Sequence, residues 1–268
     1  MRLYALAVYL FLYIPIGVIA LFSFNAGRHA AQFSGFSLQW YGKTLANPFV
    51  VNAVKTSFTV AVTSALLATL FGTLAAVALQ GVRGRLRLFY DALVYVAVMV
   101  PGIVIGIATL IALVTVFDTV NPLLATLFGP ENPVHLGLGK GSLIAAHGLF
   151  TMALVIIIVR ARLQGMDRSL LEASADLGAP PMRSFVQITL PQIAPAVLAG
   201  FLLAFTFSFD DFIIAFFVAG SETTLPIYVF SSIRRGVTPE INVIGTLVLA
   251  ASLLSLITAQ VIMRRRSH

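Results

Sequence analysis

The sequence predicts an all-α, polytopic membrane protein with six membrane-spanning helices. Hydrophobic residues make up 59% of the 268 residues, charged residues make up only 10%, and the mean hydropathy is +0.98. Water-soluble domains contain fewer apolar and more charged residues. Six segments reach the roughly 20 apolar residues that a helix needs to cross the hydrocarbon core. They are residues 3–24, 54–80, 89–117, 142–160, 196–219 and 240–263.

The first of these segments is expected to be a retained helix. It follows Arg2 as in a signal peptide, but its apolar run is longer than that of a leader and no small-residue cleavage site follows at once. The chain is therefore expected to form a single transmembrane domain over residues 1–268. In that domain the core spans cover about 54–263, the additional span covers about 3–24, and a cytoplasmic loop covers about 161–195.

The basic residues predict which side of the membrane each loop faces. With the amino terminus inside, eleven of the 17 Lys and Arg residues are cytoplasmic and six are external, which is the bias of the positive-inside rule. Both termini are therefore predicted to be cytoplasmic. The net charge of +7 is explained by this topology and by lipid headgroups, so no nucleic-acid partner is expected. The cytoplasmic residues are Arg2, Arg83, Arg85, Arg87, Arg160, Arg162, Arg168, Arg183, Arg264, Arg265 and Arg266.

Three external connections follow from this orientation. Residues 25–53 contain Trp40 and Tyr41, an amphipathic pair that favours a helix on the outer membrane surface. Residues 118–141 are rich in proline and glycine and favour turns. Residues 220–239 end in a helix-start signal of a hydroxyl, a proline and an acid.

The cytoplasmic loop is much longer than a simple connection between two helices requires. Ser169 and Glu172 are spaced as a capping box, and Gly178 can supply a left-handed stop, so a short helix is predicted between them. A second short helix is predicted over 182–190 and is expected to end at Pro191. Two such helices are too small to form a domain, so the loop is expected to dock on the transmembrane helices or on a partner.

This loop resembles that of the permease subunits of binding-protein-dependent ABC importers. The family pattern is E-A-A, three residues, G, nine residues, I, one residue, L-P. This chain keeps every spacing and changes only the second alanine, to serine. The matching residues are Glu172, Ala173, Ser174, Gly178, Ile188, Leu190 and Pro191.

The resemblance implies the type I ABC importer permease fold in a bacterial plasma (inner) membrane. In this family the loop forms coupling helices that sit in a cleft of a separate ATPase, which binds ATP and Mg. The resemblance also implies two ATPase copies, a second permease chain and an external substrate-binding protein. No G-x-x-x-x-G-K-[ST] motif is present in the sequence, so no cofactor and no catalytic residue are expected in this chain.

Three shorter stretches resemble polyamine (spermidine or putrescine) permeases: residues 208–212, 224–226 and 236–242. The first holds Asp210 and Asp211, two carboxylates within an apolar span, where a charge normally faces a polar cavity or a partner. One is expected to line the substrate pathway and the other to contact a neighbouring helix or subunit. The alternative is a hydrogen-bond network that only fixes helix packing.

An amine cation suits this segment, because carboxylates offset lost hydration and aromatic rings add cation–π contacts. The rings considered are Phe207, Phe209, Phe212, Tyr228 and Phe230. Asp91 and His147 are interpreted as structural residues near span ends, where water or headgroups solvate them. Glu222 and Glu240 are expected either to meet a substrate-delivering protein or to be solvated. Pro101, with Gly102 and Gly106, is expected to interrupt the third span.

Other classes of function remain open at this stage. Opines, other organic cations, and ferric or thiamine-type substrates are alternatives, because permeases of one fold serve many ligands. An ATPase-independent secondary transporter would show internal inverted symmetry or a midplane ion site, and neither is evident in the sequence. A membrane-embedded enzyme would need clustered His, Asp or Glu residues, and the spans contain no such cluster and no metal motif.

Overall fold

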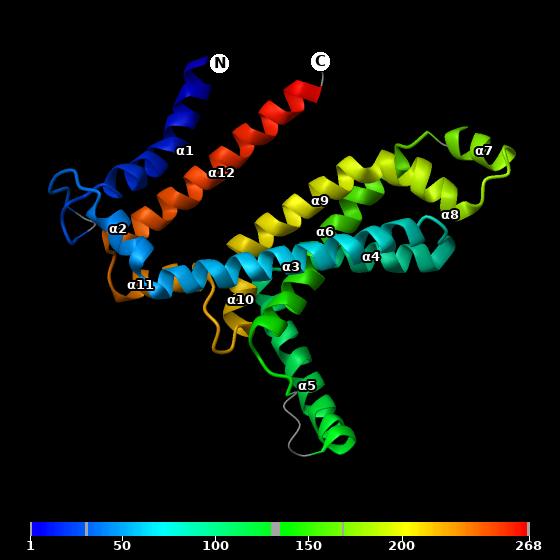
Figure 1. Ribbon diagram of the computed structural model, residues 1–268, viewed down its shortest axis with the longest axis horizontal. Helices are drawn as coiled ribbons and strands as arrows, with labels where there is room; N and C mark the ends of the chain where they lie inside the picture. Colours follow the sequence, from blue (N-terminus) through cyan, green and yellow to red (C-terminus); the bar gives the residue numbers. More distant parts are fainter. Residues whose placement is uncertain (1, 30–31, 130–134, 168, 267–268) are drawn as a thin grey trace. The chain divides into compact units, whose positions relative to one another are not determined.

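The computed structural model describes residues 2–29, 32–129, 135–167 and 169–266, and every regular element within them is a helix. An isolated β-bridge joins Asn25 and Phe36. The helices are α1 (Arg2–Phe22), α2 (Gln39–Ala46), α3 (Pro48–Ala78), α4 (Gly84–Met99), α5 (Gly102–Phe128), α6 (Lys140–Gln164), α7 (Ser169–Asp176), α8 (Pro181–Ser184), the π-helix η1 (Phe185–Thr189), α9 (Leu190–Asp210), α10 (Ile213–Val218), α11 (Leu225–Arg235) and α12 (Pro239–Arg266) (Figure 1).

Five helices in the described part of the chain are long and apolar enough to span a membrane. They are Leu3–Phe22, Pro48–Ala78, Gly102–Phe128, Lys140–Gln164 and Pro181–Asp210, and a shorter apolar segment covers Pro239–Leu254. These six segments correspond to the six predicted spans, although two boundaries differ, as described below. The chain divides into unit 1 (Met1–Ala53 with Tyr228–His268) and unit 2 (Val54–Ile227).

In unit 1, α12 packs against both α1 and α2. The predicted surface helix of the first connection is α2. The Trp40 indole N–H donates to the Gly27 carbonyl at 3.0 Å, and the Lys43 ammonium lies 4.7 Å from the Trp40 ring centroid. Asn47, which follows α2, donates to Glu240 of α12 at 2.7 Å. Glu240 is therefore engaged within unit 1 rather than simply solvated, which corrects the solvated interpretation.

The core of unit 2 forms where α3, α6 and α9 meet at Val155. This fully buried side chain of α6 lies between Gly72 of α3 and Gly200 of α9. A Cβ added at Gly72 would lie 2.9 Å from the Val155 Cβ, and one at Gly200 would lie 3.3 Å from Val155 Cγ1. Small residues at such contacts allow helices in a membrane to approach closely.

Gly72→Ala is expected to lower the stability of the detergent-solubilised protein by about 1–3 kcal/mol, because the added methyl overpacks against Val155 and the backbone of α6. The measurement is the thermal unfolding midpoint. Gly148→Ala is the matched control, because its Cβ would meet only the Ser64 carbonyl at 3.8 Å. Equal midpoints for Gly72→Ala and Gly148→Ala would refute the overpacking.

The predicted interruption of the third span at Pro101 is confirmed, but it separates two helices instead of bending one. Residues 89–117 are not one interrupted helix: α4 ends at Met99, and a separate α5 runs to Phe128. Val100 has ψ 133° and Pro101 has ψ 136°, so both are extended, as expected at and before a proline. Figure 1 shows α4 and α5 pointing in different directions from this break. Gly106 lets α10 approach, since a Cβ there would meet the Phe217 ring at 2.6 Å.

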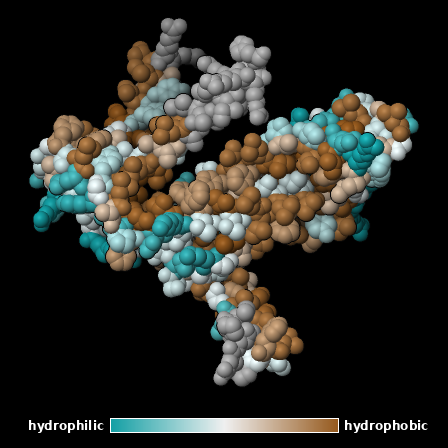
Figure 2. Space-filling view, in the orientation of Figure 1, coloured by the Kyte–Doolittle hydropathy of each residue, from teal (hydrophilic) through white to brown (hydrophobic). Residues whose placement is uncertain are grey.

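The second external connection is also shorter than predicted. Residues 118–128 continue α5, with Pro122 inside the helix, and residues 130–134 lie outside the described part of the chain. Most of α5 is exposed within this chain, as are the apolar outer faces of α3 and α9. Figure 2 shows hydrophobic residues over α3 and α9, and hydrophilic and hydrophobic residues together at α7 and α8. The exposed apolar faces are suited to contact lipid or another subunit.

Candidate functional site: the α9–α10 break and the cytoplasmic loop

Helix α9 ends at Asp210, and α10 begins after a two-residue break, so the prediction of one continuous helix over 196–219 is wrong. Asp211 ends α9 because its backbone is extended, with φ −70° and ψ 122°. Its carboxylate Oδ2 accepts the backbone N–H of Ala215 at 2.9 Å. A side-chain acceptor of this kind satisfies an N–H that has no partner in the first turn of a helix. Asp211 therefore both ends one helix and caps the next.

The break borders a cavity of about 460 Å³. Its lining residues are Thr206, Phe207, Asp210, Asp211, Phe212 and Ile213. Asp210 is exposed, and its carboxylate makes no hydrogen bond or ion pair with any residue that the structure describes. The two aspartates thus have different surroundings, because Asp211 is bonded within the protein and Asp210 is not.

The structure distributes the predicted aromatic residues unevenly around this cavity. Phe207 and Phe212 line it, but Phe209 lies outside the lining and stacks on Phe205 with 5.8 Å between ring centroids. Phe209 points away from the cavity because it lies two positions after Phe207, and side chains at that spacing on a helix point in nearly opposite directions. Tyr228 belongs to unit 1, where it donates to Glu240 at 3.3 Å, and Phe230 of the same unit lies 6.0 Å from the Arg234 guanidinium.

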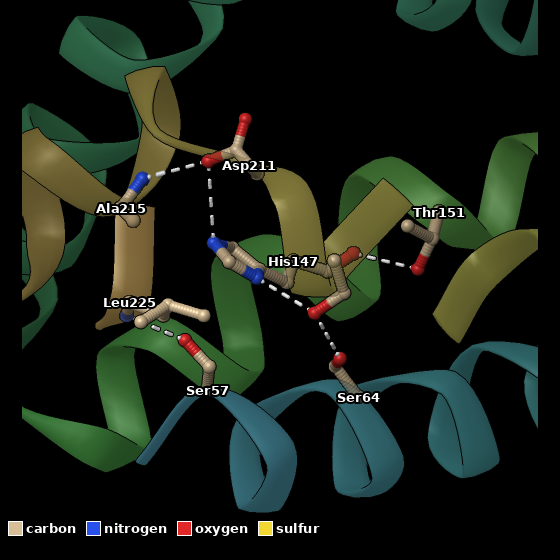
Figure 3. A network of polar contacts seen from close by, with 8 residues as sticks. Ser57, Ser64, His147, Thr151, Asp211, Ala215 and Leu225 are labelled. Carbon is tan, nitrogen blue, oxygen red and sulfur yellow. Dashed lines mark hydrogen bonds and ion pairs between the residues drawn. The ribbon is translucent and has the colours of Figure 1, made fainter. Parts of the chain in front are cut away.

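A buried chain of polar side chains leads to the break from two other helices (Figure 3). His147 of α6 is 2% exposed, so the expectation that water or headgroups solvate it is wrong. Its Nδ1 lies 2.8 Å from the Ser208 hydroxyl of α9, which lies 2.9 Å from the Ser64 hydroxyl of α3. Its Nε2 faces Asp211 Oδ2 at 3.4 Å. Neither Ser64 nor Ser208 stands out in the sequence as a member of such a network.

The loop predicted to be cytoplasmic forms a helix, a glycine turn and a second helix, as expected. Gly178 has φ +72°. Its N–H donates to the Ala175 carbonyl at 2.9 Å, and the N–H of Ala179 donates to the Ser174 carbonyl at 3.1 Å. These two bonds make a Schellman motif, whose left-handed position favours glycine. The left-handed stop expected at Gly178 is therefore confirmed.

The start of α7 differs from the expected capping box. Ser169 is already helical, and its backbone N–H donates to the Asp167 carboxylate at 2.9 Å. This bond and a second one from the Ser169 hydroxyl hold the pKa of Asp167 below its usual value. Asp167 therefore caps the helix that Ser169 was expected to cap. Arg168, which was assigned to the cytoplasmic side, lies outside the described residues.

Ser174, which replaces the second alanine of the family pattern, connects the two short helices of the loop. Ser174 of α7 is buried, and its hydroxyl lies 2.7 Å from the hydroxyl of Ser184 in α8. Glu172 lies in the first turn of α7, where its charge suits the positive end of the helix dipole. Ala173 lies one residue further along. The alanine-to-serine change thus adds a hydrogen bond between the two short helices.

Pro191 does not end the second helix, which corrects the prediction. Helix α8, the π-helix η1 and α9 form one continuous apolar helix over Pro181–Asp210. The Leu190 N–H donates to the Phe185 carbonyl, five residues back. This wider turn accommodates one extra residue just before Pro191. Pro191 has no N–H to donate, and it is therefore tolerated in the first turn of α9. Ile188 lies in the wide turn, and Leu190 begins α9.

The remaining predicted charges pair locally within unit 2. Asp91 of α4 forms an ion pair with Arg160 of α6 and a longer one with Arg87. Glu222 lies 3.7 Å from the Lys140 ammonium and accepts a hydrogen bond from Thr56 at 3.4 Å. Both carboxylates therefore join helices or connections of unit 2 instead of being simply solvated.

Solved structures with the same fold define the class of protein. The fold matches a chain of a bacterial ABC transporter that imports the acidic polysaccharide alginate, with a TM-score of 0.74, 18% identity, and coverage of 99% of this chain and 94% of that one. A chain of the MetNI methionine ABC transporter matches with a TM-score of 0.58 and 17% identity, over 79% of this chain and 92% of that one. The chain thus has the type I ABC importer permease fold.

Sequence relatives extend this result. The spermidine/putrescine transport system permease protein PotC of Escherichia coli K12 is 37% identical over 262 residues, which cover 97% of this chain and 92% of that protein. The putrescine transport system permease protein PotI of the same organism is 38% identical, over 90% of this chain and 82% of that protein. PotC of Haemophilus influenzae is 36% identical, over 97% and 95% of the two chains.

Residues 68–267 match the family model described as the binding-protein-dependent transport system inner membrane component, and the chain belongs to this family. It is therefore an inner-membrane permease subunit of an ABC importer, a transport component rather than an enzyme.

Proposed function

We propose that this chain forms half of the translocation pathway of an ATP-driven polyamine importer, with residues 1–268 acting as one transmembrane domain. The observation that carries the proposal is the cavity at the α9–α10 break, which combines two carboxylates with two aromatic rings. An ammonium group interacts favourably with both kinds of group. The names of the relatives support a polyamine, since PotC and PotI are named for spermidine and putrescine transport.

The proposed docking element for a separate ATPase is the loop of α7, Gly178 and α8. Four of its apolar side chains are exposed in the described structure: Leu177 is 88% exposed, Met182 73%, and Leu170 and Val186 48% each. A soluble loop with so much exposed apolar surface fits a protein partner. That partner, in two copies, would bind ATP and Mg. The residues proposed for coupling are Ser169, Glu172, Ala173, Ser174, Gly178, Ile188, Leu190 and Pro191.

Two further partners and the orientation belong to the same proposal. The pathway is completed by a second, related permease chain, and an external binding protein delivers the substrate. A solved alginate transporter with this fold was crystallised in complex with a periplasmic protein bound to alginate pentasaccharide. The bias of basic residues supports cytoplasmic termini, which place α7 and α8 on the side where ATP is found.

The test of substrate class is uptake by the complete complex in proteoliposomes with ATP inside. Labelled spermidine or putrescine should accumulate only with ATP and the binding protein, and excess unlabelled polyamine should compete. A monoamine at the same concentration should compete at least about tenfold more weakly, because it forms fewer charge-assisted contacts. Accumulation of a different solute, such as an opine or thiamine, without polyamine transport would refute the proposed substrate.

A further inference from the structure

The buried histidine His147 contacts the carboxylate at the edge of the cavity but does not itself line the cavity. We propose that His147 is a positioning residue, which holds Asp211 at the α9–α10 break and so leaves Asp210 as the carboxylate available to a cation. The inference rests on the proposed function only for the role of Asp210. The position of Asp211 follows from contacts within this chain.

One arrangement of hydrogens gives each ring nitrogen of His147 a suitable partner, and the Ser64 hydroxyl has a further acceptor in the Ala61 carbonyl at 3.3 Å. Ser64 donates to Ser208, and Ser208 donates to Nδ1 of His147. The proton of the neutral ring then lies on Nε2, which points at Asp211 Oδ2 (Figure 3). With the opposite arrangement, an unprotonated Nε2 would face a carboxylate. The arrangement with the proton on Nε2 is therefore favoured by the Asp211 carboxylate, and the serine contacts are compatible with it.

The contact between Nε2 and Asp211 has no substitute in the described structure. At 3.4 Å it is longer than a good hydrogen bond, and the buried Nε2 has no closer partner. Since Nε2 makes no hydrogen bond in the described structure, its attraction to Asp211 is electrostatic, and that attraction would weaken if Asp211 moved away. The histidine thus favours the position of Asp211 that is observed here.

Helix α10 is held at its other end as well. The Ser142 hydroxyl, near the start of α6, donates to the Val218 carbonyl at the end of α10 at 2.7 Å. At the break, the Ala215 N–H donates to Asp211, which in turn faces His147. Both ends of this short helix are therefore tied to α6. Because Ser142 fixes the far end, His147 determines how the end beside the cavity is placed.

The experiment compares two amide replacements in the complete complex. The side-chain nitrogen of His147→Gln can take the place of Nε2 and donate to Asp211, whereas that of His147→Asn reaches only the position of Nδ1. We expect His147→Asn to lower polyamine-stimulated uptake about tenfold, as loss of a contact to a charged group does, and His147→Gln to stay within about threefold of the native rate. Thr151→Val is the control, because that buried hydroxyl bonds only within α6.

A second readout needs no substrate. The chain has no cysteine, so spin labels can be placed at Leu149→Cys of α6 and Phe216→Cys of α10, both exposed, in a complex whose partner subunits carry no reactive cysteine. His147→Asn should shift or broaden the distance distribution between the labels. His147→Gln and Thr151→Val should leave the distribution unchanged. If His147→Asn fails to assemble, Ser208→Ala takes its place, because it removes the partner of Nδ1 and of Ser64 but keeps the imidazole.

The outcomes separate this inference from the proposed function. Equal uptake and equal label distances for the Asn and Gln variants would overturn the positioning role, whatever the substrate is. A shift of α10 in His147→Asn that Gln reverses, in a complex that transports no polyamine, would support the positioning role and refute the proposed substrate.

Discussion

Replacing Gly178 with valine is expected to reduce ATP-driven uptake about tenfold, because a β-branched residue at φ +72° costs about 1–2 kcal/mol or more. The strain falls on the Schellman turn that joins α7 to α8, so the docking loop would lose its shape while the membrane helices remain folded. Uptake by the reconstituted complex and retention of the ATPase during purification are the measurements.

A graded series at the same position separates backbone strain from contact with a partner. A Cβ at Gly178 meets nothing within 4 Å in this chain, so space inside the loop is not limiting. If strain decides the result, uptake should fall in the order Gly178→Asn, Gly178→Ala, Gly178→Val, because asparagine tolerates the left-handed region best. If the ATPase packs directly on the glycine, asparagine should be as harmful as valine.

The control is Gly165→Val, in the segment between α6 and α7. Gly165 is exposed and has φ −89°, a value open to any residue, so uptake should be nearly unchanged. Full uptake with Gly178→Val would contradict the importance of the turn. A solubilised complex that never retains an ATPase would contradict the docking role itself and favour an ATPase-independent transporter.

The turn of the loop was predictable because its chemistry is local. Gly178 lies within two helical turns of the polar residues that precede it. Helix capping depends on such short spacings, so the sequence alone indicates the turn. The same local rules failed at Pro191. A proline ends a helix only if nothing accommodates its missing N–H, and here the wide turn of η1 does so. Sequence spacing carries little information about such a π-helical turn.

The break after Asp210 could not be predicted for a different reason. The sequence indicates two carboxylates in an apolar run, but the end of α9 depends on partners brought together by the fold. Ser64 and Ser208 are 144 residues apart, and His147 lies on a third helix. His147 does stand out as an ionisable residue in an apolar helix, which is itself a signal of function or buried pairing. Its burial and its partners required the three-dimensional arrangement.

The different surroundings of the two aspartates lead to the second prediction. Asp210→Asn is expected to lower polyamine-stimulated ATP hydrolysis and uptake at least about tenfold, because a charge-assisted contact to an ammonium contributes about 1.5–3 kcal/mol. Basal ATP hydrolysis and assembly should not change, since Asp210 makes no bond within the described chain that the variant would break. Stimulated and basal hydrolysis by the reconstituted complex are the measurements.

Asp211→Asn is the matched comparison, one residue away in the same cavity lining. The asparagine carbonyl can still accept the Ala215 N–H and face His147, so a smaller loss is expected, within about threefold. Asp211→Leu keeps neither contact, and it should disturb α10 and lower activity strongly. Equal activity in the two asparagine variants would refute the division of roles. Native activity in both variants would refute a role of the two carboxylates in cation transport, because removing either negative charge should weaken the attraction of this cavity for a cation.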